Sequence, residues 1–162
     1  MGEPRLTLDL AVTVMAPPEG TTAFVNLLLQ HFALRVPDPV AFARQTRVVP
    51  IRAPNGCNGD ISLGIPGYEE EVIRRAVDYG VAPGKAIRLC SPEDLIIHKA
   101  VAGRPQDLMD IAGVVYRQGE RLDVTYIRRW LREFATLLEM PEITERFERA
   151  WHEFRSDAAE RG

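Results

Sequence analysis

Two acidic residues on predicted strands are the clearest candidates for chemistry. Asp9 lies in the apolar stretch Leu6–Met15, and Asp60 follows the turn-forming run Asn55–Gly59. Alternate side chains of a strand point to the same face, so an Asp-x-Asp sequence here would aim two carboxylates together. Such a pair, joined by a third acid, is how many phosphoryl-transfer sites hold two magnesium ions. Asp9 and Asp60 could be the first and third acids, but the second position holds Ala11.

Each of these acids also has a purely structural interpretation. A carboxylate within an apolar strand is costly unless it is paired, hydrogen-bonded or metal-bound. Asp60 could instead satisfy backbone amides of the turn that precedes it. Asp9 has no flanking turn residues, but Glu3 and Arg5 are near enough in sequence for an ion pair at the start of the strand. The two acids therefore need support from the rest of the chain.

A second group of charged residues lies in the helical half of the chain. Lys99 is polar but falls at the margin of an apolar helix stripe, where it could neutralise a phosphate. Asp107 and Asp110 are three residues apart and share one helix face, and Arg104 could pair with either acid or bind a phosphate through two hydrogen bonds. The simpler interpretation is a solvated lysine and a helix start with favourable acids. We expect His98 to be a packing or surface residue, because no second histidine has metal-binding spacing to it.

The elements that must position these residues alternate between strands and helices in the first half of the chain. We expect strands at Leu6–Met15, 47–53, 60–65 and 86–90, because these runs are apolar or β-branched and are bounded by turn residues. Helices are expected from Thr21 or Thr22 through Phe32, and from Tyr68 to Tyr79. The run Asn55–Gly59 predicts a hairpin turn.

The second half is predicted to be helical. Ser91 followed by proline and two acids is a typical helix start, and helices with apolar stripes are expected up to about Gly119, from Asp123 and from Pro141. The predicted fold class is α+β, with a small mixed sheet flanked by helices and followed by a C-terminal helical region. We assign residues 1–90 to the α/β core, 91–156 to helices packed on it in one compact unit, and 157–162 to a frayed tail.

Composition limits the classes of protein to which this chain can belong. Its 162 residues suit one domain, and its formal net charge of −3 gives no overall electrostatic attraction to nucleic acid. Cys57 and Cys90 match no metal-binding spacing, so we expect small buried or turn residues in a reducing cytoplasm, with a disulfide as the less favoured alternative. No apolar run is long enough to cross a bilayer. We expect a soluble, cytoplasmic protein without a membrane partner.

Taken together, these motifs resemble the AbiEii-type branch of the nucleotidyltransferase superfamily, which includes toxin components of bacterial toxin–antitoxin and phage-abortive systems. The resemblance rests on residues 2–11, on Asp60-Ile61, and on the block from Ser91 through Lys99 and Arg104 to Asp110. It covers nearly the whole chain in order, and the helical block is its most specific part.

The resemblance implies transfer of a nucleotidyl group from a nucleoside triphosphate to a tRNA or protein acceptor, with Mg²⁺ as cofactor. By position, it makes Asp9 and Asp60 the catalytic, metal-binding acids. It makes Lys99, Arg104 and Asp107 the residues near the nucleotide. Two metal ions would align the nucleophile and stabilise the leaving pyrophosphate.

The sequence departs from this pattern in two places. Ala11 replaces the second acid, and only eight residues precede Asp9, so the upstream helix and the Gly-Ser or Gly-Gly turn of the family are missing from this sequence. Both departures affect the same half of the active site, which predicts a truncated or degenerate member with little or no activity. The alternative function is a catalytically silent binding or interaction protein of a toxin–antitoxin-like system. In a third interpretation, the helices over 130–154 dock on an antitoxin or on a second copy of the chain.

Overall fold

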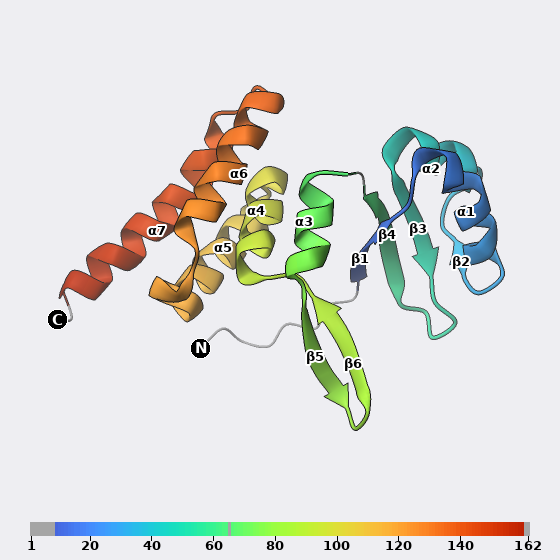
Figure 1. The fold of residues 1–162 in the computed structure, drawn as a ribbon, viewed down its shortest axis with the longest axis horizontal. Helices are drawn as coiled ribbons and strands as arrows, with labels where there is room; N and C mark the ends of the chain where they lie inside the picture. The colour runs from blue at the N-terminus through green and yellow to red at the C-terminus, as the bar shows by residue number, and fades with distance from the viewer. Residues whose placement is uncertain (1–8, 65, 161–162) are drawn as a thin grey trace. The chain divides into compact units, whose positions relative to one another are not determined.

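The computed structural model describes residues 9–64 and 66–160 and has an α+β fold (Figure 1). Its internal contacts divide the chain into two compact units, Met1–Arg75 and Ala76–Gly162. Within the described residues, the first unit contains a four-stranded mixed sheet and the second a two-stranded sheet followed by helices. This confirms the predicted fold class. The unit boundary assigned from the sequence, at residue 90, falls inside the second unit.

The sheet of the first unit has a mixed topology in the order β1-β4-β3-β2. These strands are β1 (Asp9–Met15), β2 (Ala33–Leu34), β3 (Val48–Arg52) and β4 (Asn58–Gly64). β1 pairs in parallel with β4, whereas the β2–β3 and β3–β4 pairs are antiparallel. Three of the strands match the sequence-based prediction, although residues 6–8 of the first lie outside the described residues.

Two helices cover one face of this sheet, as Figure 1 shows. They are α1 (Thr21–Leu29) and α2 (Pro39–Thr46), and the second was not expected from the sequence. The core between helices and sheet contains apolar side chains from both layers, namely Val25, Leu28, Ala43, Val49, Ile51, Ile61 and Leu63. A third helix, α3 (Tyr68–Arg75), contacts β1.

The two faces of β4 have opposite chemical character. Ile61 and Leu63 point into the core, while Asp60 and Ser62 alternate with them and face the other side of the sheet. We call this other side the polar face. Because Ile61 and Leu63 are buried in the core, strand alternation places Asp60 on the opposite side of the sheet.

The second unit begins with a hairpin in place of the C-terminal end of a predicted helix. β5 (Val77–Ala82) pairs antiparallel with β6 (Lys85–Leu89), so the prediction of a helix continuing to Tyr79 was wrong beyond Arg75. The apolar residues of this stretch fit a helical period, but the turn around Gly84, which has a φ of 69°, brings a second β-type run alongside the first. Cross-strand pairing therefore overrides the local helical pattern.

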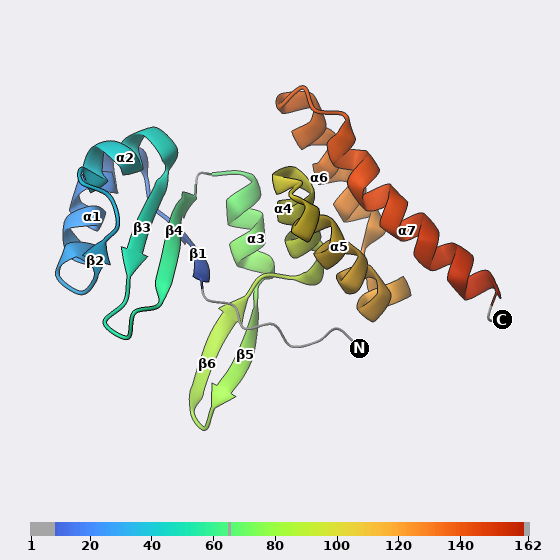
Figure 2. The same cartoon turned by 180° about the vertical axis from the view of Figure 1, so that it is seen from behind.

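The remainder of the second unit is a group of packed helices, seen from behind in Figure 2. They are α4 (Pro92–Ala102), α5 (Pro105–Gln118), α6 (Val124–Leu137) and α7 (Glu142–Glu160). Their apolar stripes meet in a core that includes Ile97, Ile111, Ile127 and Phe147, all fully buried. α7 continues to Glu160, so residues 157–160 of the expected frayed tail are helical. Of the helices described, none is both long and apolar enough to span a bilayer.

Candidate functional site

Asp60 lies on the polar face of β4, directly after a tight hairpin connection. Gly56 in this connection has a φ of 85°, and the Cys57 amide donates to the Asn55 side chain at 3.1 Å, which confirms the predicted turn. The carboxylate of Asp60 forms an ion pair with the guanidinium of Arg35, and its side chain is 54% exposed. The turn thus shapes the connection, but the counter-charge of Asp60 comes from elsewhere in the fold.

The parallel pairing of β1 with β4 places Ala11 directly opposite Asp60. Paired residues on neighbouring strands share a face of the sheet and lie about 4.8 Å apart. An acid at position 11 would therefore lie beside Asp60, as the resemblance requires. Asp9 is paired through its backbone with Asn58, and its side chain lies outside the described residues.

Arg35 is the residue of this site that the sequence reasoning missed. It follows the two-residue strand β2, and its Nε donates to the Ile51 carbonyl at 3.1 Å while Nη2 donates to the Gly59 carbonyl at 3.3 Å and to Asp60. A strand of two residues carries almost no periodic signal, and Arg35 is 25 positions from Asp60. No local sequence pattern therefore predicts the contact between Arg35 and Asp60.

The donor set near Asp60 does not fit the magnesium ions that the resemblance implies. Mg²⁺ takes oxygen ligands in octahedral geometry and is held by carboxylates and phosphates. Here Asp60 contributes one carboxylate, which is paired with a guanidinium, and position 11 contributes a methyl group. Within the described part of the chain, no three His, Cys, Asp or Glu side chains are grouped to hold a metal. Nothing in these side chains supports a step through a metal ion.

The other three candidate residues lie together in the second unit. Lys99, on α4, donates to Asp107 at 3.2 Å and to Asp110 at 2.6 Å, both on α5. Arg104, in the connection between the two helices, pairs with Asp107 at 2.7 Å through Nε. The amide of Gln106 adds a 3.3 Å hydrogen bond to Asp110. These charges form one network that fastens α5 to α4.

Asp107 is the centre of this network because its carboxylate is almost completely buried. It accepts hydrogen bonds from Lys99, from the Arg104 side chain, and from the Arg104 backbone N–H at 3.1 Å, which completes a capping box at the start of α5. Burial by itself raises the pKa of Asp107, but the hydrogen bonds from Arg104 and Lys99 outweigh it. The net pKa is below the ordinary value. The carboxylate is thus held ionised.

The sharp bend between α4 and α5 depends on Gly103. This residue ends α4 in the left-handed region, with a φ of 63°, and a Cβ there would overlap the guanidinium of Arg146. Arg146 in turn donates to the Ala100 carbonyl at 2.6 Å, which satisfies the exposed end of α4. The local chemistry of this bend explains how Lys99 is brought close to the first turn of α5.

A second buried carboxylate joins α4 to α6. Asp94 is fully buried, and its two oxygens accept from the Ser91 hydroxyl at 2.7 Å and from the Tyr126 hydroxyl at 2.8 Å. Glu93 accepts from the Asp123 backbone N–H at 3.2 Å. Ser91 and Asp94 were expected only as parts of a helix start, and the long-range partner Tyr126 was missed. These hydrogen bonds connect the start of α4 to the start of α6 and so have a structural role.

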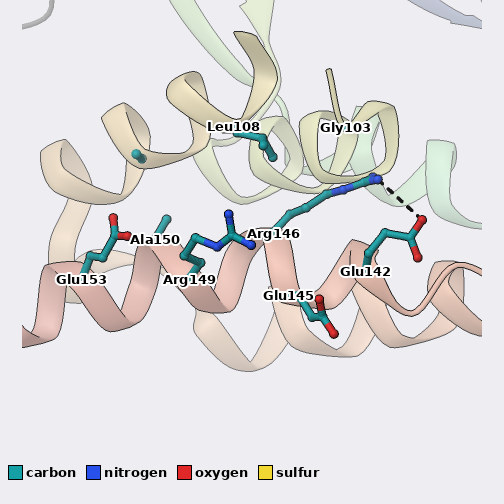
Figure 3. Close-up of a pocket in the computed structure, with 9 residues that line it drawn as sticks. Gly103, Leu108, Glu142, Glu145, Arg146, Arg149, Ala150 and Glu153 are labelled. Atoms are coloured by element: carbon teal, nitrogen blue, oxygen red, sulfur yellow. Dashed lines mark ion pairs between the residues drawn. The ribbon is translucent and has the colours of Figure 1, made fainter. Parts of the chain in front are cut away.

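A cavity in the second unit is lined by none of the candidate residues. It has a volume of about 310 Å³ and lies between α7, α5 and the connection that precedes α5 at Gly103 (Figure 3). Leu108, Ala112 and Ala150 form its apolar lining. Its charged lining consists of Glu142, Glu145, Arg146, Arg149 and Glu153. Three glutamates against two arginines give this lining a net negative charge. Such a lining is unfavourable for a triphosphate.

The structure thus gathers the sequence-derived candidates into two sets, one in each unit. Asp60 lies in the first unit with Arg35, and Lys99, Arg104 and Asp107 are brought together in the second. In each set, a described candidate side chain is already bonded to an oppositely charged residue of its own unit. In comparisons with known proteins, no family model matches this chain, and no curated protein matches it significantly.

Proposed function

We propose that this chain is a degenerate AbiEii-type nucleotidyltransferase that has lost catalysis and acts by binding. The observation that carries the proposal is the state of Asp60, which is paired with Arg35 and lies opposite Ala11. A two-metal site needs several carboxylates with an excess of negative charge. Among the described side chains, the carboxylate of Asp60 balanced by the guanidinium of Arg35 does not supply it.

The charged network of the second unit supports the same proposal. Lys99 and Arg104 already donate to Asp107, whose carboxylate is buried, so turning these side chains away to bind the phosphates of a nucleotide would break hydrogen bonds of this network. Breaking a buried pair leaves a charge without compensation, which is strongly unfavourable. The network is better suited to holding two helices together.

The test of the silent state is a labelling assay on the full chain. We expect no transfer from any of the four radiolabelled nucleoside triphosphates to a tRNA pool or to the protein itself, with Mg²⁺ present. We also expect no thermal stabilisation by the triphosphates. Magnesium-dependent labelling that disappears in Asp60→Ala would overturn the proposal and establish a nucleotidyltransferase.

Active nucleotidyl transfer remains the second candidate, because one observation favours it. The parallel register places position 11 beside Asp60, where the second acid of a metal-binding set would belong. This arrangement supports descent from an enzyme that used Mg²⁺ and a nucleoside triphosphate to modify a tRNA or protein acceptor. The same labelling assay decides between the two candidates.

The surface that supports a binding role is the β5–β6 hairpin. The pairs Val77–Leu89 and Tyr79–Ile87 place four large apolar side chains on one face, with exposed fractions between 41% and 59%. An isolated two-stranded hairpin is marginally stable in water, and exposed apolar patches mark interaction sites. We therefore assign this face to binding.

The occupant that fits this apolar face is a second copy of this chain, related to the first by a two-fold axis. Asp78 and Arg88 pair across the strands and form an ion pair at 3.7 Å, and by strand alternation they lie on the opposite face of the hairpin. Two apolar faces could therefore pack together and bury their large apolar side chains. Cys57 and Cys90 both have exposed side chains, and we propose a reducing, cytoplasmic setting for such a dimer.

Light scattering coupled to size-exclusion chromatography tests this assignment. We expect a dimer for the native chain and a monomer for Tyr79→Lys. Leu137→Lys is the matched control, because Leu137 is 76% exposed but lies on α6, away from the hairpin. A native monomer, or equal dissociation by both substitutions, would contradict self-pairing; a monomer that captures a different protein through Tyr79 would assign the hairpin to that partner.

A further inference from the structure

One cross-strand row on the polar face contains Asp60 and the residues that decide its charge environment. The backbone N–H of Arg35 donates to the Pro50 carbonyl at 3.0 Å, Pro50 pairs with Asp60, and Asp60 pairs with Ala11. Paired residues of neighbouring strands lie on the same face. Arg35 and Ala11 therefore flank Asp60 from opposite ends of a single row.

Arg35 is fixed in this row by more than its charge. Its Nε is bonded to the Ile51 carbonyl at 3.1 Å, and its Nη2 to the Gly59 carbonyl at 3.3 Å. These two anchors carry the guanidinium across β3 to the carboxylate of Asp60 on β4. The side chain of Arg35 is 31% exposed, so it is partly enclosed where it meets Asp60. Hydrogen bonds to backbone carbonyls of β3 and β4 therefore hold the Arg35 guanidinium in place on the sheet.

We propose that Arg35 is a resident cation that takes the place of a metal ion at Asp60, and that Arg35 and Ala11 together close a latent divalent-cation site. The inference deepens the proposed silent state, on which it rests, by naming its cause. A guanidinium in contact with a carboxylate repels an approaching divalent cation. It also occupies the carboxylate oxygens that the cation would need as ligands. Ala11 supplies no second carboxylate beside Asp60, so the positive charge of Arg35 balances the Asp60 carboxylate.

This inference differs from the simpler account in which Ala11 alone silences the site. If the missing acid were the whole cause, Ala11→Asp would restore metal binding by itself. If Arg35 also closes the site, the carboxylate added by Ala11→Asp still has the positive charge of Arg35 in the same cross-strand row, and this charge opposes metal binding. Metal binding then requires that both residues be changed. The two accounts predict different results for the same single variant.

The experiment is a Mn²⁺ titration of the full chain, followed by the electron paramagnetic resonance signal of the free ion. The variants are Ala11→Asp, Arg35→Gln and the double variant that combines them. We expect saturable binding in the double variant, at least about tenfold tighter than in either single variant, because Ala11→Asp adds a negative charge and Arg35→Gln removes a positive one. Adding Asp60→Asn should abolish this binding, which shows that Asp60 supplies a ligand.

Arg52→Gln provides the matched control for removing an arginine from the same face. Arg52 pairs with Asn58 in the sheet and donates to its side chain at 3.2 Å, and it has no contact with Asp60 among the interactions of the described residues. Ala11→Asp combined with Arg52→Gln should bind Mn²⁺ no better than Ala11→Asp. Ala11→Asp combined with Arg35→Lys should also fail to bind, because it keeps the positive charge.

The inference is overturned if Ala11→Asp alone binds Mn²⁺ as tightly as the double variant with Arg35→Gln. It is also overturned if Arg52→Gln produces the same gain, or if the folded double variant does not bind. Circular dichroism establishes folding, and Arg35→Met, which keeps a long apolar stem, replaces Arg35→Gln if that variant is unfolded. Nucleotide labelling by the native chain would refute the proposed silent function without altering these Mn²⁺ comparisons.

Discussion

The charge pair of Asp60 in the first unit and the charged network of Asp107 in the second differ chiefly in burial. In the first unit, Asp60 and Arg35 meet on an exposed sheet face, with Asp60 54% exposed. In the second, Asp107 is 3% exposed and is shared by Lys99 and Arg104. An exposed ion pair contributes little to stability, whereas a buried carboxylate must keep its partners. Similar charged side chains therefore lie on an exposed sheet face in one unit and stabilise a helix junction in the other.

Removing the buried carboxylate should have the largest effect. We expect Asp107→Ala to lower the free energy of unfolding by about 2–4 kcal/mol, because it removes the cap of α5 and leaves Lys99 with a single carboxylate partner in the network. Urea denaturation followed by circular dichroism measures the loss. A change below about 0.5 kcal/mol, typical of ordinary surface substitutions, would show that burial does not separate the two clusters.

The buried network of Asp94 should show a smaller loss when one donor is removed. Tyr126→Phe deletes the hydroxyl that donates to Asp94 at 2.8 Å, but Ser91 continues to donate to the other oxygen. We expect a loss of about 1–2 kcal/mol, since this is a hydrogen bond to a buried carboxylate. The same urea experiment measures it, with Tyr116→Phe as a control whose hydroxyl bonds to exposed Asp157. Equal losses for the two tyrosines would contradict the role of burial.

Acid titration should reveal part of the contribution of Asp107. Its folded-state pKa is lowered from the value of 3.8, so the unfolded state takes up its proton first as the pH falls. The stabilisation is therefore present above pH 3.8 and is lost as the pH falls through the folded pKa. Unfolding experiments between neutral pH and pH 3 should show a flatter pH dependence for Asp107→Asn than for the native chain. If the free energy of unfolding varied with pH in the same way for both proteins, groups other than Asp107 would cause the loss of stability in acid.

The exposed pair of the first unit should have the smallest effect on stability. We expect Asp60→Asn to change the free energy of unfolding by less than about 1 kcal/mol, because solvent screens the interaction with Arg35. The measurement is the same denaturation series. A loss as large as that of Asp107→Ala would remove the distinction between an exposed charge pair and a buried one.

The helix junction was largely accessible from the sequence. Ser91 and Asp123 were expected as N-caps and accept the Asp94 and Tyr126 backbone N–H groups as predicted. Arg104 was also expected to be able to pair with a nearby acid. These interactions connect residues three positions apart, and such contacts follow from helix geometry alone.

The prediction failed where pairing between distant segments outweighed local periodicity. The apolar spacing around Val77 fits a helix, but Val77 pairs with Leu89 in a hairpin. α2 and β2 were missed because they are short and give weak periodic signals. The sequence indicated Asp60 as a candidate but gave no sign of Arg35, which comes from a strand end 25 residues earlier.

The α+β class, most helix starts and the β3–β4 turn could be predicted from local sequence patterns. The parallel pairing of β1 with β4, which places Ala11 opposite Asp60, and the ion pair of Arg35 with Asp60 across β3 were visible only in the folded chain. The difference lies in the range of the interactions. Caps, turns and helix pairs depend on residues a few positions apart, whereas sheet register and cross-strand ion pairs depend on how the whole unit buries its apolar face.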